Sequence, residues 1–225
     1  MSRSSDRRPA RLHDVPRAAW IVARAFTATS RLQRHPARPW ALTLHAAAAL
    51  PFALMATAAG ALASSLYLDD SRTGVVVMGR RHRLLLGAAL TGIIIGAVMA
   101  PCVLVLLWSL PAGTWPVVAV LAAGCGAVGA ELVIPQGGAE PPDETSQPVP
   151  HTPSWTQWEM SLLAQLPETT VTAARLAHDL LHSLPSAGEV VVAQARTDGL
   201  RGEYLQYGFR PAHGRQLLIA PVPGV

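Results

Sequence analysis

The chain of 225 residues contains no lysine, and only 14% of its residues are charged. An ordinary soluble protein has about 25% charged residues, so this deficit argues against a purely soluble globular enzyme. Half of the residues are hydrophobic, which excludes an intrinsically disordered chain. The largest gap in charge covers residues 84–130, which include no Asp, Glu, Lys or Arg.

Several motifs of known chemistry are also missing. The two cysteines, Cys102 and Cys125, both lie in the uncharged middle of the chain and imply no disulfide framework. The sequence has no P-loop, dinucleotide fingerprint, nucleophile elbow or pair of catalytic carboxylates. His178 and His182 have the i, i+4 spacing of two metal ligands, but no carboxylate or cysteine partner is recognisable near them. We therefore expect no metal site.

The charges that are present divide the chain into three parts. Residues 1–83 contain 13 arginines and four aspartates, whereas residues 131–225 contain five arginines and ten acidic residues. A basic head, an uncharged middle and an acidic tail are typical of a membrane protein with a soluble end. The composition, rich in alanine and arginine, is that of a GC-rich bacterial genome, so we expect the inner membrane of a bacterial cell.

The head, residues 1–38, is predicted to be a basic amphipathic arm. One side of a helix over residues 12–31 is apolar, and Arg17, Arg24 and Arg31 fall on the other. This pattern predicts a helix lying on an anionic membrane, with its arginines on lipid headgroups and its apolar side in the acyl boundary. A disordered basic arm is the alternative. Nucleic acid is the less favoured partner, because a membrane segment follows immediately. The apolar side comprises Leu12, Val15, Ala19, Val22, Ala23 and Phe26.

Residues 39–134 are predicted to form a transmembrane region of two or three helices. Three stretches, 39–68, 84–110 and 115–134, approach the 20 or so apolar residues that cross a bilayer. The second and third form a predicted hairpin, with Trp108 and Trp115 at the membrane–water interface. Small residues recur at every fourth position of this hairpin, which favours close helix packing and a possible homo-oligomer: Gly92 and Gly96, then Ala122, Gly126 and Ala130.

The stretch 39–68 poses a problem of orientation. The positive-inside rule places both residues 1–38 and the arginines of Ser71–Arg83 in the cytoplasm. These two segments flank the stretch, so both lie inside only if it does not cross the membrane. Either four arginines are outside, or residues 39–68 are re-entrant or interfacial. The sequence leaves both alternatives open.

A proline-rich linker, residues 135–154, precedes a tail of residues 155–225 that reads as a small α/β unit. Its pattern predicts a strand at Glu159–Gln165, a helix from Thr169 or Thr170 to Leu184, and a strand at Glu189–Ala195. A second helix at Asp198–Tyr207 and a last strand at Gln216–Ala220 follow, with crossover connections between the strands. Gly208 suits the left-handed position after a helix.

The tail resembles the C-terminal half of the GNAT N-acetyltransferase superfamily. In that family a buried strand is followed by a short helix carrying a tyrosine and by the pattern Y-x-x-x-G-F, which Tyr204, Gly208 and Phe209 match here. The resemblance covers about a third of the chain. It implies an acyltransferase that uses acetyl-CoA or another acyl-CoA, with Tyr204 as the general acid that protonates the departing thiolate. We expect Tyr207 and Phe209 to be core residues.

The resemblance also places the cofactor site in the turn after the first tail strand. Gln165, Thr169, Thr170 and Val171 occupy the positions whose backbone N–H groups bind the cofactor pyrophosphate in that family. Glu168 and Thr170 stand where the family has glycines, so a carboxylate opposes the pyrophosphate and side chains crowd its approach. Weakened or lost catalysis follows, and the rival function is a non-catalytic membrane scaffold or interaction protein.

Overall fold

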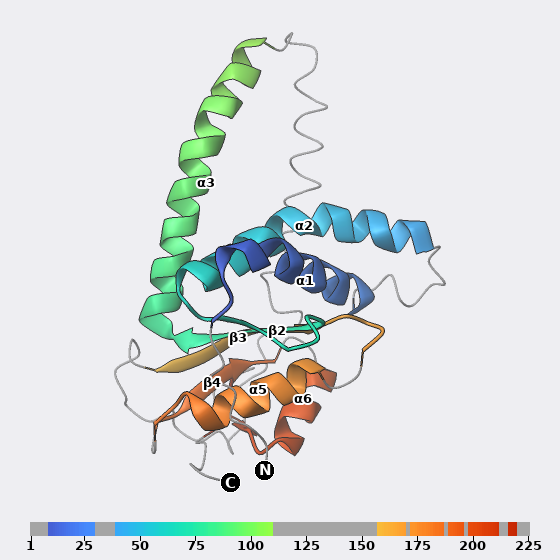
Figure 1. Cartoon of the computed structure of the whole chain (residues 1–225), viewed down its shortest axis with the longest axis vertical. Helices are drawn as coiled ribbons and strands as arrows, with labels where there is room; N and C mark the ends of the chain where they lie inside the picture. Colours follow the sequence, from blue (N-terminus) through green and yellow to red (C-terminus); the bar gives the residue numbers. More distant parts are fainter. Residues whose placement is uncertain are drawn as a thin grey trace.

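The computed structural model describes residues 9–29, 39–109, 157–169, 172–186, 189–195, 198–211 and 216–219 (Figure 1). The helices are η1 (Leu12–Asp14), α1 (Val15–Thr29), α2 (Pro39–Leu62), α3 (Arg81–Ser109), α5 (Thr172–Ser183) and α6 (Asp198–Gln206). The strands are β1 (Leu66–Leu68), β2 (Gly74–Arg80), β3 (Trp158–Gln165), β4 (Val191–Gln194), β5 (Arg210–Pro211) and β6 (Gln216–Ile219). The fold therefore combines helices with a mixed sheet.

All the described strands belong to one 6-stranded sheet with the order β1-β2-β3-β4-β6-β5. β3 and β4 are parallel, and every other neighbouring pair is antiparallel. β2 and β3 are paired although residues 81–157 lie between them, and the N–H of Arg81 donates to the carbonyl of Gln157 at 3.0 Å. The chain thus leaves the sheet after β2 and returns beside the point at which it left.

This pairing corrects two expectations. The α/β unit is not confined to residues 155–225, because β1 and β2 supply two strands of the same sheet. β1 lies inside the stretch 39–68, which we expected to be an apolar membrane helix throughout. The helix in this stretch, α2, ends at Leu62. The run of valines in β2 was not predicted as a strand, although β-branched residues are typical of strands and all residues of β2 except the last are buried.

The sheet separates two hydrophobic cores. Val75 and Val77 of β2 face α1 and α2, whereas Val76 and Met78 face α5 and α6, because successive side chains of a strand point to opposite sides. Figure 1 shows α1 and α2 stacked on one side of the sheet, with α5 and α6 on the other. The domain is therefore a three-layer structure, and the layer of α1 and α2 comes from the first 62 residues.

The apolar side of α1 is covered by protein. Ala19 and Ala23 are fully buried and Val22 almost fully, in the core that α1 shares with α2 and the sheet. The interpretation of this helix as lying with its apolar side in the acyl boundary is therefore wrong. Alanines on both helices explain the fit, since small side chains let α1 and α2 approach closely. Leu12 is the exception among the predicted apolar residues and is exposed.

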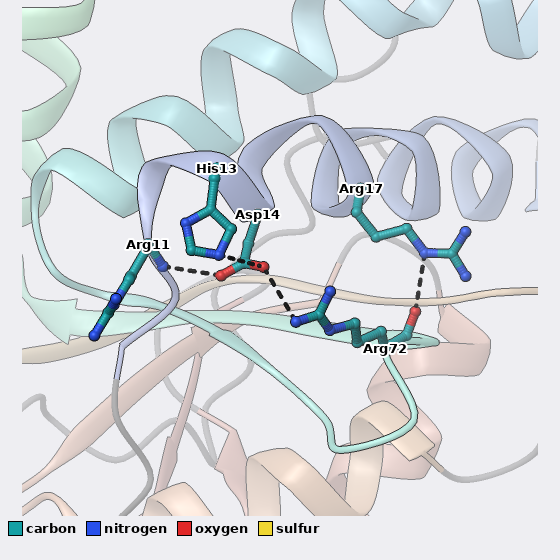
Figure 2. A network of polar contacts seen from close by, with 5 residues as sticks. All are labelled: Arg11, His13, Asp14, Arg17 and Arg72. Atoms are coloured by element: carbon teal, nitrogen blue, oxygen red, sulfur yellow. Dashed lines mark hydrogen bonds and ion pairs between the residues drawn. The ribbon is translucent and has the colours of Figure 1, made fainter.

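Polar contacts fix the start of α1 to the loop between β1 and β2 (Figure 2). The carboxylate of Asp14 accepts a hydrogen bond from the N–H of Arg11 at 3.1 Å and lies 3.7 Å from the guanidinium of Arg72. The Nε of Arg17 donates to the carbonyl of Arg72 at 3.2 Å. The head and the segment 71–83 are thus in direct contact.

The tail elements follow the sequence pattern closely. β3, α5, β4, α6 and β6 are the five predicted elements, each within a few residues of its expected bounds. α5 buries Ala173, Leu176, Ala177 and Leu180, and Leu184 packs against the same core, as the helical period predicts. Gly208 has φ +87°, the left-handed conformation expected after α6. The second crossover is wrong, because β4 pairs antiparallel with β6.

α2 includes the segment Leu42–Leu62, which is long and apolar enough to cross a membrane. Of its most apolar window, 22% is buried inside the protein. The core helix of a soluble protein meets the same criteria, so length and composition alone do not make α2 a membrane span. Two or three crossings are accordingly not confirmed. The expected third span at 115–134 and the linker at 135–154 lie outside the described residues.

α3 extends away from the three-layer domain (Figure 1). Its large apolar side chains are exposed to an unusual degree: Ile93 is 67% exposed and Val105 68%. Gly92 and Gly96 have open space beside them in this chain. The expected helix at 84–110 is therefore present as a helix, while Arg81, His82 and Arg83 form its first turn.

Gly87 sets the contact between α3 and α2. A Cβ atom at this position would collide with the backbone carbonyl of Ala59 and would lie 2.9 Å from the Cβ of Ala63. Gly92 on the same helix would meet nothing within 4 Å. The two glycines are therefore a matched pair that differs in its contact with α2.

Gly87→Ala should destabilise the protein by about 1–3 kcal/mol, because the added methyl group forces α2 and α3 apart. Gly92→Ala should be neutral or stabilising by up to about 1 kcal/mol, since alanine meets no neighbour and only reduces the conformational entropy of the unfolded chain. Thermal unfolding in detergent micelles measures both. Equal melting temperatures for the two variants would show that α2 and α3 do not pack as described.

Candidate functional site

The parallel strands β3 and β4 run side by side for only part of their length. Their paired positions are Trp158 with Val191, Glu159 with Val192 and Met160 with Ala193. β3 continues to Gln165 with β2 on its other side, and in the described residues its pairing with β4 stops at Met160. In open α/β sheets ligands bind at the carboxyl ends of parallel strands, so this end of β3 and β4 is the candidate site.

Gln165 organises the turn that leads from β3 into α5. Its Oε1 accepts a hydrogen bond from the N–H of Ala173 at 3.3 Å, and its Nε2 donates to the carbonyl of Thr169 at 3.1 Å. The hydroxyl of Thr169 donates to the carbonyl of Leu166 at 2.8 Å. Gln165 thus satisfies an N–H group in the first turn of α5, one of those that would otherwise meet an anion. Thr170 and Val171 lie outside the described residues.

Glu168 in this turn forms an ion pair with Arg24 of α1. An Nη of Arg24 lies 2.5 Å from Oε1 of Glu168, and the two side chains are 31% and 62% exposed. The carboxylate that we expected to oppose a pyrophosphate therefore has a cation beside it. Sequence reasoning missed this role of Arg24, because its only sign was a place on the polar side of an amphipathic helix.

The loop between β1 and β2 supports the same turn. The N–H of Leu166 donates to the carbonyl of Thr73 at 2.9 Å, and a Cβ atom at Gly74 would lie 2.9 Å from the backbone nitrogen of Ala173. Asp69 holds this loop by accepting hydrogen bonds from Ser71 and from the N–H groups of Thr73 and Gly74. Burial raises the pKa of Asp69, but these hydrogen bonds outweigh it and leave the pKa below its usual value.

Tyr204 on α6 is buried in the core between α6 and the sheet. Its ring centroid lies 5.1 Å from that of Phe209, and its backbone carbonyl accepts hydrogen bonds from the N–H groups of Tyr207 and Phe209. Phe209 is buried as expected, whereas Tyr207 is 51% exposed and is not a core residue. The surroundings of Tyr204 account for a packing role, and its role as a general acid stays a prediction.

At the opposite end of the β3–β4 pair, Glu189 accepts hydrogen bonds from the N–H of Ser186 at 2.8 Å and the indole of Trp158 at 2.7 Å. Arg80 lies 3.0 Å from the same carboxylate and 5.7 Å from the Trp158 ring centroid. The hydrogen bond from Ser186 is the largest cause of the lowered pKa of Glu189. This network joins β2, β3 and the residues just before β4. It lies where the chain leaves the sheet for residues 81–157, the segment inserted between β2 and β3.

The described residues contain no group of three or more His, Cys, Asp or Glu side chains placed to hold a metal ion. His178 and His182 lie with their ring centroids 4.4 Å apart on α5. No protein-family model matches the chain, and no curated protein matches its sequence.

Proposed function

We propose that the chain is an integral membrane protein whose three-layer domain is a GNAT-like acyl-CoA-dependent N-acyltransferase, with α3 as a membrane anchor. The observation that carries this proposal is that the parallel pairing of β3 with β4 ends at Met160 and Ala193, while β3 continues to Gln165. α5 begins beyond the carboxyl end of β3, and α6, which bears Tyr204, begins beyond that of β4. The two helices of the region that resembles the family thus follow the same end of the parallel pair.

The position of β1 and β2 removes one objection to activity. The tail alone resembles only half of a GNAT domain. Residues 10–80 add strands β1 and β2 to its sheet and pack helices α1 and α2 on one face of that sheet. The edge of β3 beyond Met160 also carries backbone amide groups suited to the amides of a pantetheine arm. A domain of this size has the elements to surround both a cofactor and an acceptor.

The length, exposure and charge of α3 support its role as the anchor. α3 spans Arg81–Ser109, about 43 Å at 1.5 Å per residue, against a hydrocarbon core of about 30 Å. Residues 84–130 are free of formal charge, and the arginines before them favour a cytoplasmic domain. Because β2 and β3 are paired, the inserted segment must cross the membrane an even number of times. The predicted hairpin of 84–110 and 115–134 meets this requirement.

In the proposed reaction an amine nitrogen attacks the thioester carbonyl, the C–S bond breaks, and the departing thiolate takes a proton from the hydroxyl of Tyr204. The amine proton passes to a base or to solvent. Whether this hydroxyl reaches the thiolate decides between an enzyme and the second candidate function, a non-catalytic scaffold. Two features favour the scaffold: Gln165 at the end of β3 already accepts the N–H of Ala173 in the first turn of α5, and Glu168 brings a carboxylate to the same turn.

Acetyl-CoA binding to the full-length protein in lipid nanodiscs tests the proposal. We expect weak, saturable binding in calorimetry that adenosine 3′,5′-bisphosphate displaces, because the cofactor phosphates meet Arg24 and the first turn of α5. No binding at millimolar cofactor would leave the scaffold as the function.

Tyr204→Phe is the catalytic arm of the same test. It keeps the ring contact with Phe209, so acetyl-CoA should bind unchanged while turnover with an amine acceptor falls about 100-fold or more. Unchanged turnover would assign Tyr204 to packing alone.

A further inference from the structure

We propose that α2 lies in the plane of the membrane interface, with its outer face in the headgroup–acyl boundary, and that it does not cross the bilayer. The proposal rests on the membrane anchor α3 described above. It identifies the occupant of a surface that the protein itself leaves uncovered.

α2 is apolar on both of its sides. One side, which includes Ala46, Ala49 and Ala53, is buried against α1. The opposite side is exposed, with Trp40 and Leu44 each 60% exposed, and Asp, Glu, Lys and Arg are absent from residues 39–68. A helix that is apolar all round needs apolar surroundings on every side. The protein core covers one side of α2, so the exposed face needs another apolar partner. The exposed residues of α2 are all apolar except Thr43: Trp40, Thr43, Leu44, Ala47, Ala48, Pro51, Met55 and Ala56.

The uncovered face continues onto α3. The Gly87 contact places α3 directly against the C-terminal part of α2, and α3 extends beyond the side of the domain that α2 covers (Figure 1). A bilayer around α3 would therefore meet α2 as well. This continuity favours lipid over a second copy of the chain, because one surface then serves both helices.

The depth of α2 agrees with an interfacial position. Arg83 precedes Gly87 by one helical turn, about 6 Å along α3. If Arg81 and Arg83 sit among the headgroups, α2 lies about 5–10 Å into the boundary, which is the usual depth of interfacial helices. Trp40 at its other end is the residue type that membrane interfaces favour.

A crossing by α2 conflicts with the contacts at its two ends. The N–H of Ala10 donates to the carbonyl of Leu66 at 2.7 Å, and Arg17 donates to Arg72. The chain before α2 and the chain after it are therefore joined on one side of any membrane. With α2 in the interface, residues 1–38 and 71–83 both face the cytoplasm, as the positive-inside rule requires.

Spin-label depth in the full-length protein tests this placement. Cys102 and Cys125 are replaced by alanine, and single nitroxides are placed at Leu44, Ala48 or Met55 in nanodiscs of zwitterionic and anionic phospholipid. Accessibility to oxygen and to a water-soluble nickel complex gives the depth of each. A label at Ile94 on α3 is the lipid control, and one at exposed Arg175 on α5 is the water control.

We expect the three α2 labels to lie at one shallow depth, within a few ångströms of one another, with Ile94 deeper. A crossing helix would instead separate Leu44 from Met55 by about 16 Å in depth, which would overturn the proposal. Labels on α2 that match Arg175 would overturn it too, as the face would then lie in water. If Ile94 also matches Arg175, the membrane anchor itself is wrong.

Discussion

Replacing residues 82–156 with an Asn-Gly turn should leave a folded domain that unfolds cooperatively and is released by alkaline carbonate. Arg80 pairs with Trp158 across β2 and β3, and the N–H of Arg81 already donates to the carbonyl of Gln157. Two residues in a type I′ turn close such an antiparallel pair. The variant keeps both cores and the network of Arg80, Trp158 and Glu189. Circular dichroism during thermal unfolding measures the result.

Residues 155–225 expressed alone are the matched comparison and should not fold. β3 would lose β2, its long antiparallel partner, and Leu162 and Ala164 would lose the cover of α1. Exposure of that face costs about 25 cal/mol for each Å² of apolar surface, so about 400 Å² would cost about 10 kcal/mol, the whole stability of a typical small domain. A cooperative transition in the tail alone, combined with none in the joined variant, would mean that residues 10–80 belong to a separate unit.

The tail was predictable because its signals are local. The period of apolar residues in α5, the β-branched run of β4 and Gly208 after α6 each depend on neighbours within a few positions. The pairing of β2 with β3 has no such signal, since it depends on residues separated by the whole inserted segment. Val75–Met78 have a high strand propensity, but the sequence pattern does not indicate which strand they pair with.

The helix α1 shows a different limit. Its apolar and basic sides were predicted in the right register, yet the pattern is the same whether protein or lipid covers the apolar side. The structure shows that α2 and the sheet cover it. α2 shows the converse limit, because a helix apolar on both sides matches a membrane span in composition even though one of its sides packs on a protein core.

The candidate site was predictable in part. Gln165 lies at the end of β3, where the family resemblance placed it, and its side chain holds the turn. The counter-charge from Arg24 was not foreseen, because it is brought to Glu168 from α1 by packing. A site assembled from both halves of a domain cannot be read from one half.

Glu168→Gln should strengthen acetyl-CoA binding about tenfold, which corresponds to about 1.4 kcal/mol. The change removes a negative charge beside the first turn of α5 and releases Arg24 from its ion pair, leaving a guanidinium to contact the cofactor phosphates. Stability should change by less than about 1 kcal/mol, because Glu168 is exposed and Arg24 partly exposed to solvent, which screens the pair. Calorimetry at low and high salt measures the gain, which should shrink as salt screens the charges.

Glu159→Gln is the matched control, since this carboxylate lies at the other end of β3 and is 3.9 Å from the guanidinium of Arg81. It removes the same charge from the protein but should leave acetyl-CoA affinity unchanged. Arg24→Gln should weaken binding, and the double variant with Glu168→Gln should lose the gain, because that gain depends on the released guanidinium. An equal gain in acetyl-CoA affinity for the variants at Glu159 and Glu168 would show that the gain comes from the net charge of the protein alone. The cofactor would then bind elsewhere, and the turn after β3 would be structural.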